Sequence, residues 1–129
     1  MIAVDTNVLV RFLVRDDAKQ AARAASLLGE NQIWVAKTVL LETEWVLRSL
    51  YGFSGEEVAP ALRGIAGLPS VSLEDEAGVA KALGWLEHGV DFADALHLAS
   101  AGPALRFATF DRRLARQVKR TPGMEAISV

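Results

Sequence analysis

Short apolar runs alternate along the chain with longer stretches in which apolar residues recur every three or four positions. The short runs are rich in β-branched residues and are typical of buried strands. They are Ile2 to Val4, Ile33 to Val35, Val71 to Leu73, Arg106 to Thr109 and Ala126 to Val129. Strands that alternate with helices predict an α/β fold of three αβα layers, with a central, mainly parallel sheet.

The longer stretches carry the end signals of helices. Asp17 is suited to cap the first of them, and Gly29 to stop it. Ser54 and Glu57 form a capping box, and Asp75 is suited to cap a later helix. The predicted helices run from Ala18 to Leu28, from Thr38 to about Tyr51, from Ser54 to about Ala66, from Asp75 to about His88, from Asp91 to Ala101, and onward from Asp111.

Composition limits the class of protein. A chain of 129 residues, 51% apolar and 23% charged, is expected to form one globular domain over residues 1–129. It has no cysteine, which excludes disulfides and thiolate metal sites, and it lacks the features of a signal peptide or a membrane span. We therefore expect a cytoplasmic protein. The net charge of −2 is low for a nucleic-acid binder unless bound cations cancel some of the acids.

Two aspartates follow apolar strands and precede helices. Asp5 stands in IAVDTNVLV, and Asp111 stands in FATFDRRLARQV, which repeats the same local design. Each is explained by helix capping alone. Each also lies at the carboxyl end of a strand, where ligands bind in open sheets of this kind.

Glu42 lies within an apolar helical stripe. The predicted buried face of residues 38–50 consists of Val39, Val46, Leu47 and Leu50. Glu42 falls inside this stripe, so it needs a partner, either a nearby arginine or a shared site. Glu44 is expected to point elsewhere, as ordinary solvated charge.

The stretch DFADALHLAS, residues 91–100, is apolar nearly all round except for three polar positions. Asp91 stands at the start of the helix, where a capping role is sufficient. Asp94 lies a full turn inside, where no cap is needed. His97 lies one turn further on and is interpreted as a packing or supporting residue rather than a ligand.

Four acids thus resist an explanation as surface charge to different degrees: Asp5, Glu42, Asp94 and Asp111. If they converge, they need a cation, because like charges raise one another's pKa. Ligation by oxygen alone selects a hard ion such as Mg²⁺ or Mn²⁺. Such ions, held by few carboxylates, usually serve phosphoryl chemistry.

In order and spacing, VDTNVLV, the internal glutamate of LLETEW, DFADALHLA and TFDRRL resemble the motifs of PIN-domain nucleases. The short length resembles in particular the VapC toxins of type II toxin–antitoxin systems. The resemblance implies a PIN-like fold and makes the four acids above a catalytic quartet that holds Mg²⁺ or Mn²⁺. It implies an endoribonuclease in which a metal-activated water attacks the phosphodiester, with Asp5 and Asp94 as direct ligands.

The resemblance also assigns supporting roles and partners. Thr6, Asn7 and Thr109 match positions where the family keeps small polar groups, although cap and turn chemistry explains them equally well. RNA would be the substrate, and a small antitoxin the protein partner of a homodimer without membrane attachment. The antitoxin would dock in a groove between the first helices and the helix that ends near Ala66.

Basic residues gather on the helix that begins at Asp111. They are Arg112, Arg113, Arg116, Lys119 and Arg120. With Leu114 and Val118 turned inward, this face is either an RNA-phosphate surface or ordinary solvated charge. Arg11 and Arg15 are candidates to extend it.

Other functions remain open. One alternative is a PIN-like domain that has lost catalysis and serves as an interaction module. Another is an active nuclease that processes RNA outside a toxin–antitoxin pair. A phosphotransferase with Asp5 as nucleophile is disfavoured, because such enzymes need a second acid two residues after the first, where this chain has Asn7. Binding of divalent ions, read by thermal shift, separates a metal-dependent enzyme from a silent module.

Overall fold

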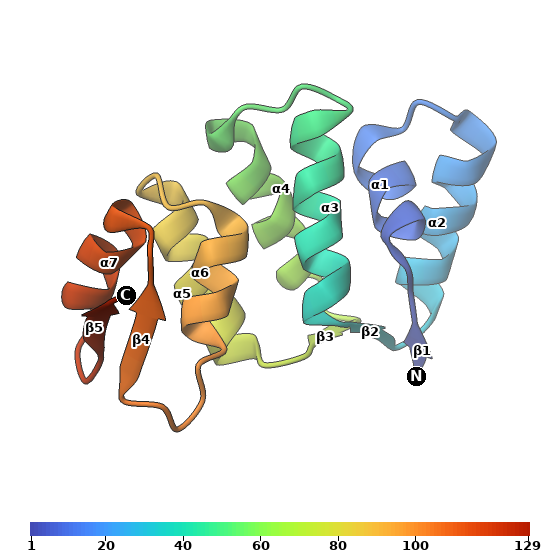
Figure 1. Cartoon of the computed structure of the whole chain (residues 1–129). Coiled ribbons are helices and arrows are strands. Elements are labelled where there is room, and N and C mark those ends of the chain that lie inside the picture. The colour runs from blue at the N-terminus through green and yellow to red at the C-terminus, as the bar shows by residue number, and fades with distance from the viewer.

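The computed structural model of the chain describes residues 1–129, except for the side chain of Ser128. Within this description, seven helices and five strands alternate (Figure 1). The strands are β1 (Ile2–Ala3), β2 (Ile33–Val35), β3 (Val71–Leu73), β4 (Arg106–Thr109) and β5 (Glu125–Ser128). The helices are α1 (Thr6–Val14), α2 (Ala18–Glu30), α3 (Lys37–Ser49), α4 (Gly55–Ala66), α5 (Glu76–Glu87), α6 (Phe92–Ala99) and α7 (Arg112–Lys119).

Every strand pair is parallel. Ile33 of β2 pairs with Ile2 of β1 on one side and with Val71 of β3 on the other. In the second ladder, Phe107 of β4 pairs with Ala126 of β5. The predicted α/β class with parallel pairing is therefore confirmed. The strands form two ladders, β1-β2-β3 and β4-β5.

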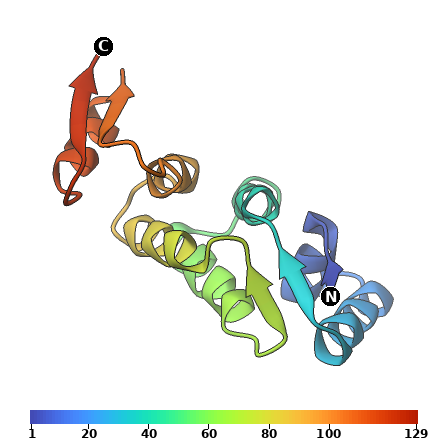
Figure 2. The same cartoon turned by 90° about the horizontal axis from the view of Figure 1, so that it is seen from below.

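The elements follow one another in an open arc. Figure 2 shows the β1-β2-β3 ladder and the β4-β5 ladder at opposite ends, with α5 and α6 between them. Helix α3 stands in the middle and packs against α1 on one side and against α4 and α6 on the other (Figure 1). This central position decides which side chains of α3 are buried.

Two apolar cores of unequal size hold the molecule together. The larger unites Val4, β2 and β3 with α1 to α6 and includes the fully buried Leu9, Ile33, Leu47 and Phe92. The smaller consists of Leu98, Leu114 and Val118, with Trp85 packed against both cores. The inward orientation predicted for Leu114 and Val118 is confirmed.

Most helix ends match the sequence signals within two residues. Asp17 accepts a hydrogen bond from the Gln20 amide at 3.0 Å, and both hydrogen bonds of the Ser54 capping box form. The predicted stop at Gly29 is wrong, because α2 continues through Glu30. A single glycine costs a helix only about 1 kcal/mol, which the packed last turn tolerates.

The first strand is less buried than its apolar sequence predicts. Ile2 is 39% exposed and Ala3 is also exposed. Among the described residues, β1 has a partner strand on one edge only, and so has β4. None of the helices in the described chain combines the length and apolarity needed to cross a bilayer.

Candidate functional site

Asp5 begins α1 and is exposed. Its carboxylate accepts a hydrogen bond from the Val8 amide at 3.2 Å, so the helix-cap interpretation is correct for this residue. The carboxylate of Asp5 has further lone pairs free, since a carboxylate can accept several hydrogen bonds. Capping therefore leaves Asp5 able to bind a ligand.

Thr6 and Glu42 join α1 to α3. The buried Thr6 hydroxyl donates a hydrogen bond to Glu42 Oε1. Glu42 itself is exposed, so the prediction that it lies in the buried stripe of α3 is wrong. Glu42 is instead held by this hydrogen bond, which places one of its carboxylate oxygens beside Thr6.

Glu44 is the buried acid of α3, contrary to its interpretation as solvated charge. It is 3% exposed and forms an ion pair with Arg48, at 2.8 Å between Nε and Oε2. The buried stripe runs through Leu40 and Leu47, whereas Leu50 is 69% exposed. The prediction placed this stripe about one residue out of phase, because apolar side chains cover more than one face of α3.

Three aspartates line one pocket beside α7. Asp91 caps α6 by accepting from the Asp94 amide at 3.2 Å. Asp111 caps α7 by accepting from the amides of Arg113 and Leu114, at 2.8 and 3.2 Å. Together with the half-buried Asp94, they line a cavity of about 320 Å³.

The pKa of Asp94 is raised above its ordinary value. Burial is the largest cause, followed by repulsion from the charges of Asp91 and Asp111, and nearby His97 opposes the rise. The two carboxylates are thus close enough to disfavour a third negative charge. A cation in this pocket would relieve that repulsion.

One face of α7 brings arginines to the same pocket. Arg113, Arg116 and Arg120 line it, at positions three and seven residues apart on one side of the helix. All three are exposed. Arg112, predicted to act with them, is exposed but lies outside this lining, and Arg120 takes its place.

Thr109 supports the turn that presents Asp111. The Asp111 amide donates to Thr109 Oγ1 at 3.0 Å, which is the local turn chemistry that threonine commonly provides. Asn7 has a different location. It lines a second pocket between α1 and α2, away from the aspartates beside α7.

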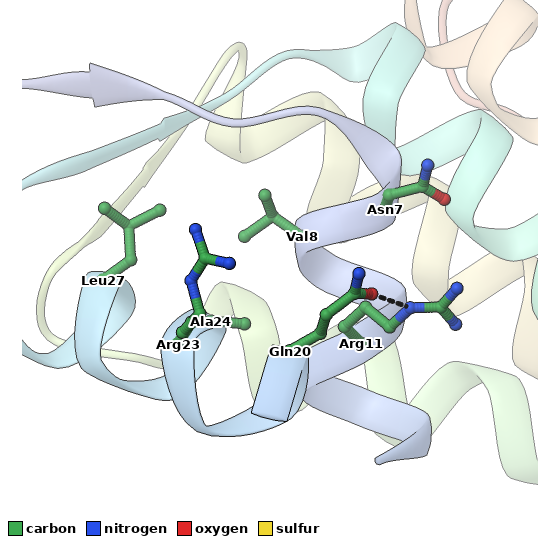
Figure 3. Close-up of a pocket in the computed structure, with 7 residues that line it drawn as sticks. All are labelled: Asn7, Val8, Arg11, Gln20, Arg23, Ala24 and Leu27. Atoms are coloured by element: carbon green, nitrogen blue, oxygen red, sulfur yellow. Dashed lines mark hydrogen bonds between the residues drawn. The ribbon is translucent and has the colours of Figure 1, made fainter. Parts of the chain in front are cut away.

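The α1–α2 pocket is shown in Figure 3. Its volume is about 510 Å³, and it is lined by Asn7, Val8, Arg11, Gln20, Arg23, Ala24 and Leu27. Arg11 is committed there, because it donates to Gln20 Oε1 at 2.6 Å and pairs with Asp16 at 3.0 Å. Its predicted contribution to the basic rim near Asp111 therefore fails. Arg15 instead lies over the Phe12 ring, at 5.4 Å from its centroid.

The predicted quartet is divided into two groups. Glu42 is hydrogen-bonded to Thr6, the residue that follows Asp5 at the start of α1. Asp94 and Asp111 instead share the pocket beside α7. Among the described residues, no three acidic or histidine side chains are close enough to hold one ion together. The all-oxygen donor set still fits Mg²⁺ or Mn²⁺. One group comes from α3 and the start of α1, and the other from α6 and the start of α7.

Sequence reasoning left two features of this region unassigned. Asp91 had only a capping role, and Arg120 was one of several surface cations. The spacing of Arg113, Arg116 and Arg120 would have indicated a single face on α7. For Asp91 the sequence has no comparable signal, because the pattern that predicts a helix cap does not show whether the same carboxylate also lines a pocket.

Comparison with protein families assigns residues 2–119 to the PIN domain. Comparison with curated proteins gives no match. The matched span includes all four predicted acids and the whole of α7. It also covers both strands that are followed by an aspartate. The chain therefore belongs to the PIN-domain family, whose members are generally nucleases and typically metal-dependent.

Proposed function

We propose that this protein is a metal-dependent endoribonuclease and the toxin of a type II toxin–antitoxin pair, similar to VapC. The observation that carries the nuclease proposal is the pocket beside α7. Asp94 and Asp111 there are flanked by Arg113, Arg116 and Arg120. Carboxylates for a divalent ion next to arginines for phosphate are the groups that phosphodiester hydrolysis requires.

The acidic and basic residues of the pocket would have different roles. Asp94 and Asp111 would hold Mg²⁺ or Mn²⁺. The pKa of Asp94 is raised first by burial and then by the charges of Asp91 and Asp111, and a bound cation would offset the second cause. The bound ion would supply an activated water and stabilise charge on the phosphate oxygens. The arginines would orient the RNA backbone, since a guanidinium binds phosphate in a bidentate manner.

Asp5 and Glu42 join this site if the two ladders meet. Strands β1 and β4 each pair in parallel on one edge only, and each is followed two residues later by an aspartate. Pairing them would place Asp5 and Asp111 at the same end of one sheet, because neighbouring parallel strands share their carboxyl edge. It would also cover Ile2, which is 39% exposed.

Cross-linking tests this closure. The chain has no cysteine, so Ala3→Cys combined with Ala108→Cys introduces a single reactive pair on the two exposed edges. A short bis-maleimide should then link the two positions within one chain and give a compact monomer band on a denaturing gel. Each single variant is the control and should give no such band. If the double variant behaves like the singles, the edges do not pair.

The toxin role implies a protein partner, for which the α1–α2 pocket is the proposed site. Val8 and Leu27 provide apolar surface there and Arg23 provides positive charge, whereas Arg11 is already paired with Asp16 (Figure 3). A partner segment that combines apolar and acidic residues would complement this lining. We further propose a homodimer, supported by the 52% exposure of Trp45, an apolar side chain typical of interfaces.

The ends of the cut RNA test the chemistry. Incubation of a defined RNA hairpin with Mn²⁺ should give a 5′-phosphate and a 3′-hydroxyl, because attack by water does not consume the 2′-hydroxyl. EDTA and Asp94→Asn should each abolish cleavage. A 2′,3′-cyclic phosphate, read by mass spectrometry, would show that the carboxylates do not act as proposed.

The toxin role has its own test. Expression of the chain should arrest growth, and Asp111→Asn should remove the arrest while leaving the protein folded. If the parent chain cleaves RNA in vitro but never slows growth, the protein is an RNA-processing nuclease instead. If divalent ions neither raise its melting temperature nor support cleavage, it is a catalytically silent interaction module.

A further inference from the structure

His88 ends helix α5 and lines the pocket beside α7. It is exposed. The Trp85 carbonyl accepts hydrogen bonds from the amides of His88 and Val90, each at 3.0 Å. Between these two amides the chain turns at Gly89, whose φ of 92° lies in the region where a side chain would be strained. The backbone of this turn therefore fixes where His88 meets the pocket.

One nitrogen of the His88 ring has a defined role in the helix. Nδ1 lies 2.8 Å from the carbonyl oxygen of Gly84, one turn earlier in α5. A carbonyl oxygen only accepts hydrogen bonds, so Nδ1 carries the proton between them. This assignment leaves Nε2 to exchange a proton with a bound molecule, and histidine is the side chain suited to such exchange near neutral pH.

The pocket that His88 lines does not depend on the edges of the two ladders. None of the described residues that line it belongs to a strand. They come from the α5–α6 turn, α6, and α7 with its cap, and Trp85 packs against the small core that contains Leu114 and Val118. The volume of about 320 Å³ is sufficient for a small ligand group. His88 therefore shares a cavity with Asp94 and Asp111 whether or not the sheet closes.

Charged groups surround His88 from every neighbouring element. They are Glu87 on α5, which pairs with Arg63 of α4, then Asp91 and Asp94 of α6, and Asp111, Arg113, Arg116 and Arg120 of α7. Among the described residues, no three acids or histidines are close enough to share one ion. His88 is therefore not a further metal ligand beside Asp94 and Asp111.

Of the groups in this pocket, His88 is the one able to release a proton. The carboxylates act as acceptors, because they would hold a cation or already accept amide hydrogen bonds. The arginines keep their protons at any pH that a folded protein meets. Hydrolysis that leaves a 3′-hydroxyl breaks the bond between phosphorus and O3′, and a proton given to that oxygen speeds its departure.

We propose that His88 is the general acid of this nuclease and gives its Nε2 proton to the 3′-oxygen that leaves the scissile phosphate. The proposal rests on the nuclease function and adds a catalytic residue to it. The oxygen of the attacking water forms the new bond to phosphorus, and one proton of that water passes to solvent. The bond to O3′ breaks with its electron pair on O3′, which takes the Nε2 proton. His88, with Nδ1 still bonded to Gly84, then regains a proton from solvent.

A substrate whose leaving group needs no proton tests this role. In a 3′-phosphorothiolate RNA, sulfur replaces the bridging 3′-oxygen and departs as a thiolate, a weaker base than an alkoxide. His88→Asn is the matched variant, because its amide N–H keeps a donor for the Gly84 carbonyl and nothing replaces Nε2. In Mn²⁺ this variant should cut ordinary RNA roughly 100-fold more slowly than the parent. It should cut the sulfur-containing RNA at the parent's rate.

A second measurement needs neither metal nor cleavage. The chain has two histidines, so ¹⁵N NMR of the histidine-labelled protein in EDTA resolves the His88 ring, with His88→Asn for assignment. The neutral ring should carry its proton on Nδ1, as the bond to Gly84 requires. Addition of a 12-nucleotide RNA should shift the Nε2 signal. Since His88 is exposed, thermal unfolding should show the variant folded.

Several results would overturn the proposal. Equal losses on the two substrates would make His88 a positioning residue, and full activity of His88→Asn on ordinary RNA would remove it from the reaction. A neutral ring with its proton on Nε2, or an Nε2 signal that ignores RNA, would contradict the assigned geometry. A folded parent that cuts neither substrate in Mn²⁺ would refute the nuclease function itself, and the role of His88 with it.

Discussion

Asp5 and Asp111 have the same local design in two different surroundings. Each follows a parallel strand and caps the next helix. Asp5 leads into α1, whose Leu9 belongs to the large core and whose Val10 is also buried. Asp111 leads into α7, which contributes only Leu114 and Val118 to the small core and turns its arginines outward.

The difference indicates how one motif serves two purposes. In the N-terminal region, residues 1–99, the helix after the aspartate is a packing element. In the C-terminal unit, residues 106–127, the helix is mainly a carrier of charge. Because few of its side chains are buried, the C-terminal unit has more surface free for ligands. The same small core gives the unit fewer buried apolar contacts and therefore a lower local stability.

The largest expected effect is a difference in stability loss between variants of the large core and of the small core. Leu47→Ala should lower the free energy of unfolding by about 4 kcal/mol, because Leu47 is fully buried in the large core. Leu114→Ala should cost about 2 kcal/mol, since a small core can collapse around the lost volume. Urea denaturation measures both, with the exposed Leu105→Ala as control. Equal losses would show that the two cores act as one.

The second prediction asks whether the two regions share a site. Asp5→Asn and Asp111→Asn should each reduce cleavage by at least about 100-fold, as even residues behind a metal ligand often cost 10- to 100-fold. The double variant should lose little more, because groups that act as a unit are not additive. Asp17→Asn alters a helix cap outside both groups and should retain activity. Full activity of Asp5→Asn would confine the site to the C-terminal unit.

The third prediction contrasts the two glutamates of α3. Arg48→Met should destabilise the protein by about 1–3 kcal/mol, because it leaves the buried Glu44 carboxylate without its partner. Glu42→Gln should change stability very little, since Glu42 is exposed. Thermal and urea unfolding at neutral pH compare them. A larger loss for Glu42→Gln would reverse the assignment of the buried acid.

The smallest effect concerns Asp94 in the absence of metal. Its folded-state pKa is raised, so its charged form destabilises the folded protein above that pKa, and the penalty disappears as pH falls below the unfolded-state value. Asp94→Asn should therefore raise the melting temperature in EDTA at pH 7 by a few degrees at most, with no gain in strong acid. Mn²⁺ should stabilise the parent more than the variant. A lower melting temperature for the variant at pH 7 would contradict this.

Much of the fold follows from local patterns in the sequence. Strands at Ile33–Val35 and Val71–Leu73 agree with the structure at both ends, because a short apolar run between turn signals has few alternatives. The caps at Asp17 and Ser54 are equally local. Periodicity failed at α3, where several apolar faces compete and tertiary packing chose the one that contains Glu44.

The site was predictable as a set of residues but not as an arrangement. The acids stand out because Asp94 lies inside a helix and Asp111 after a strand. Their grouping depends on how helices pack around α3, for which one sequence gives no distance information.

The order of the elements also has a consequence for biosynthesis. Asp5 leaves the ribosome before Asp111 and the arginines of α7, which lie roughly 100 residues further along the chain. At about 5–20 residues per second, the interval is on the order of 10 s. Throughout that time the nascent chain contains at most three of the four proposed acids and none of the α7 arginines that would bind the RNA backbone. We therefore expect a chain ended after Ala104 to be inert toward RNA, so that the messenger being read is not cut by the product still attached to it.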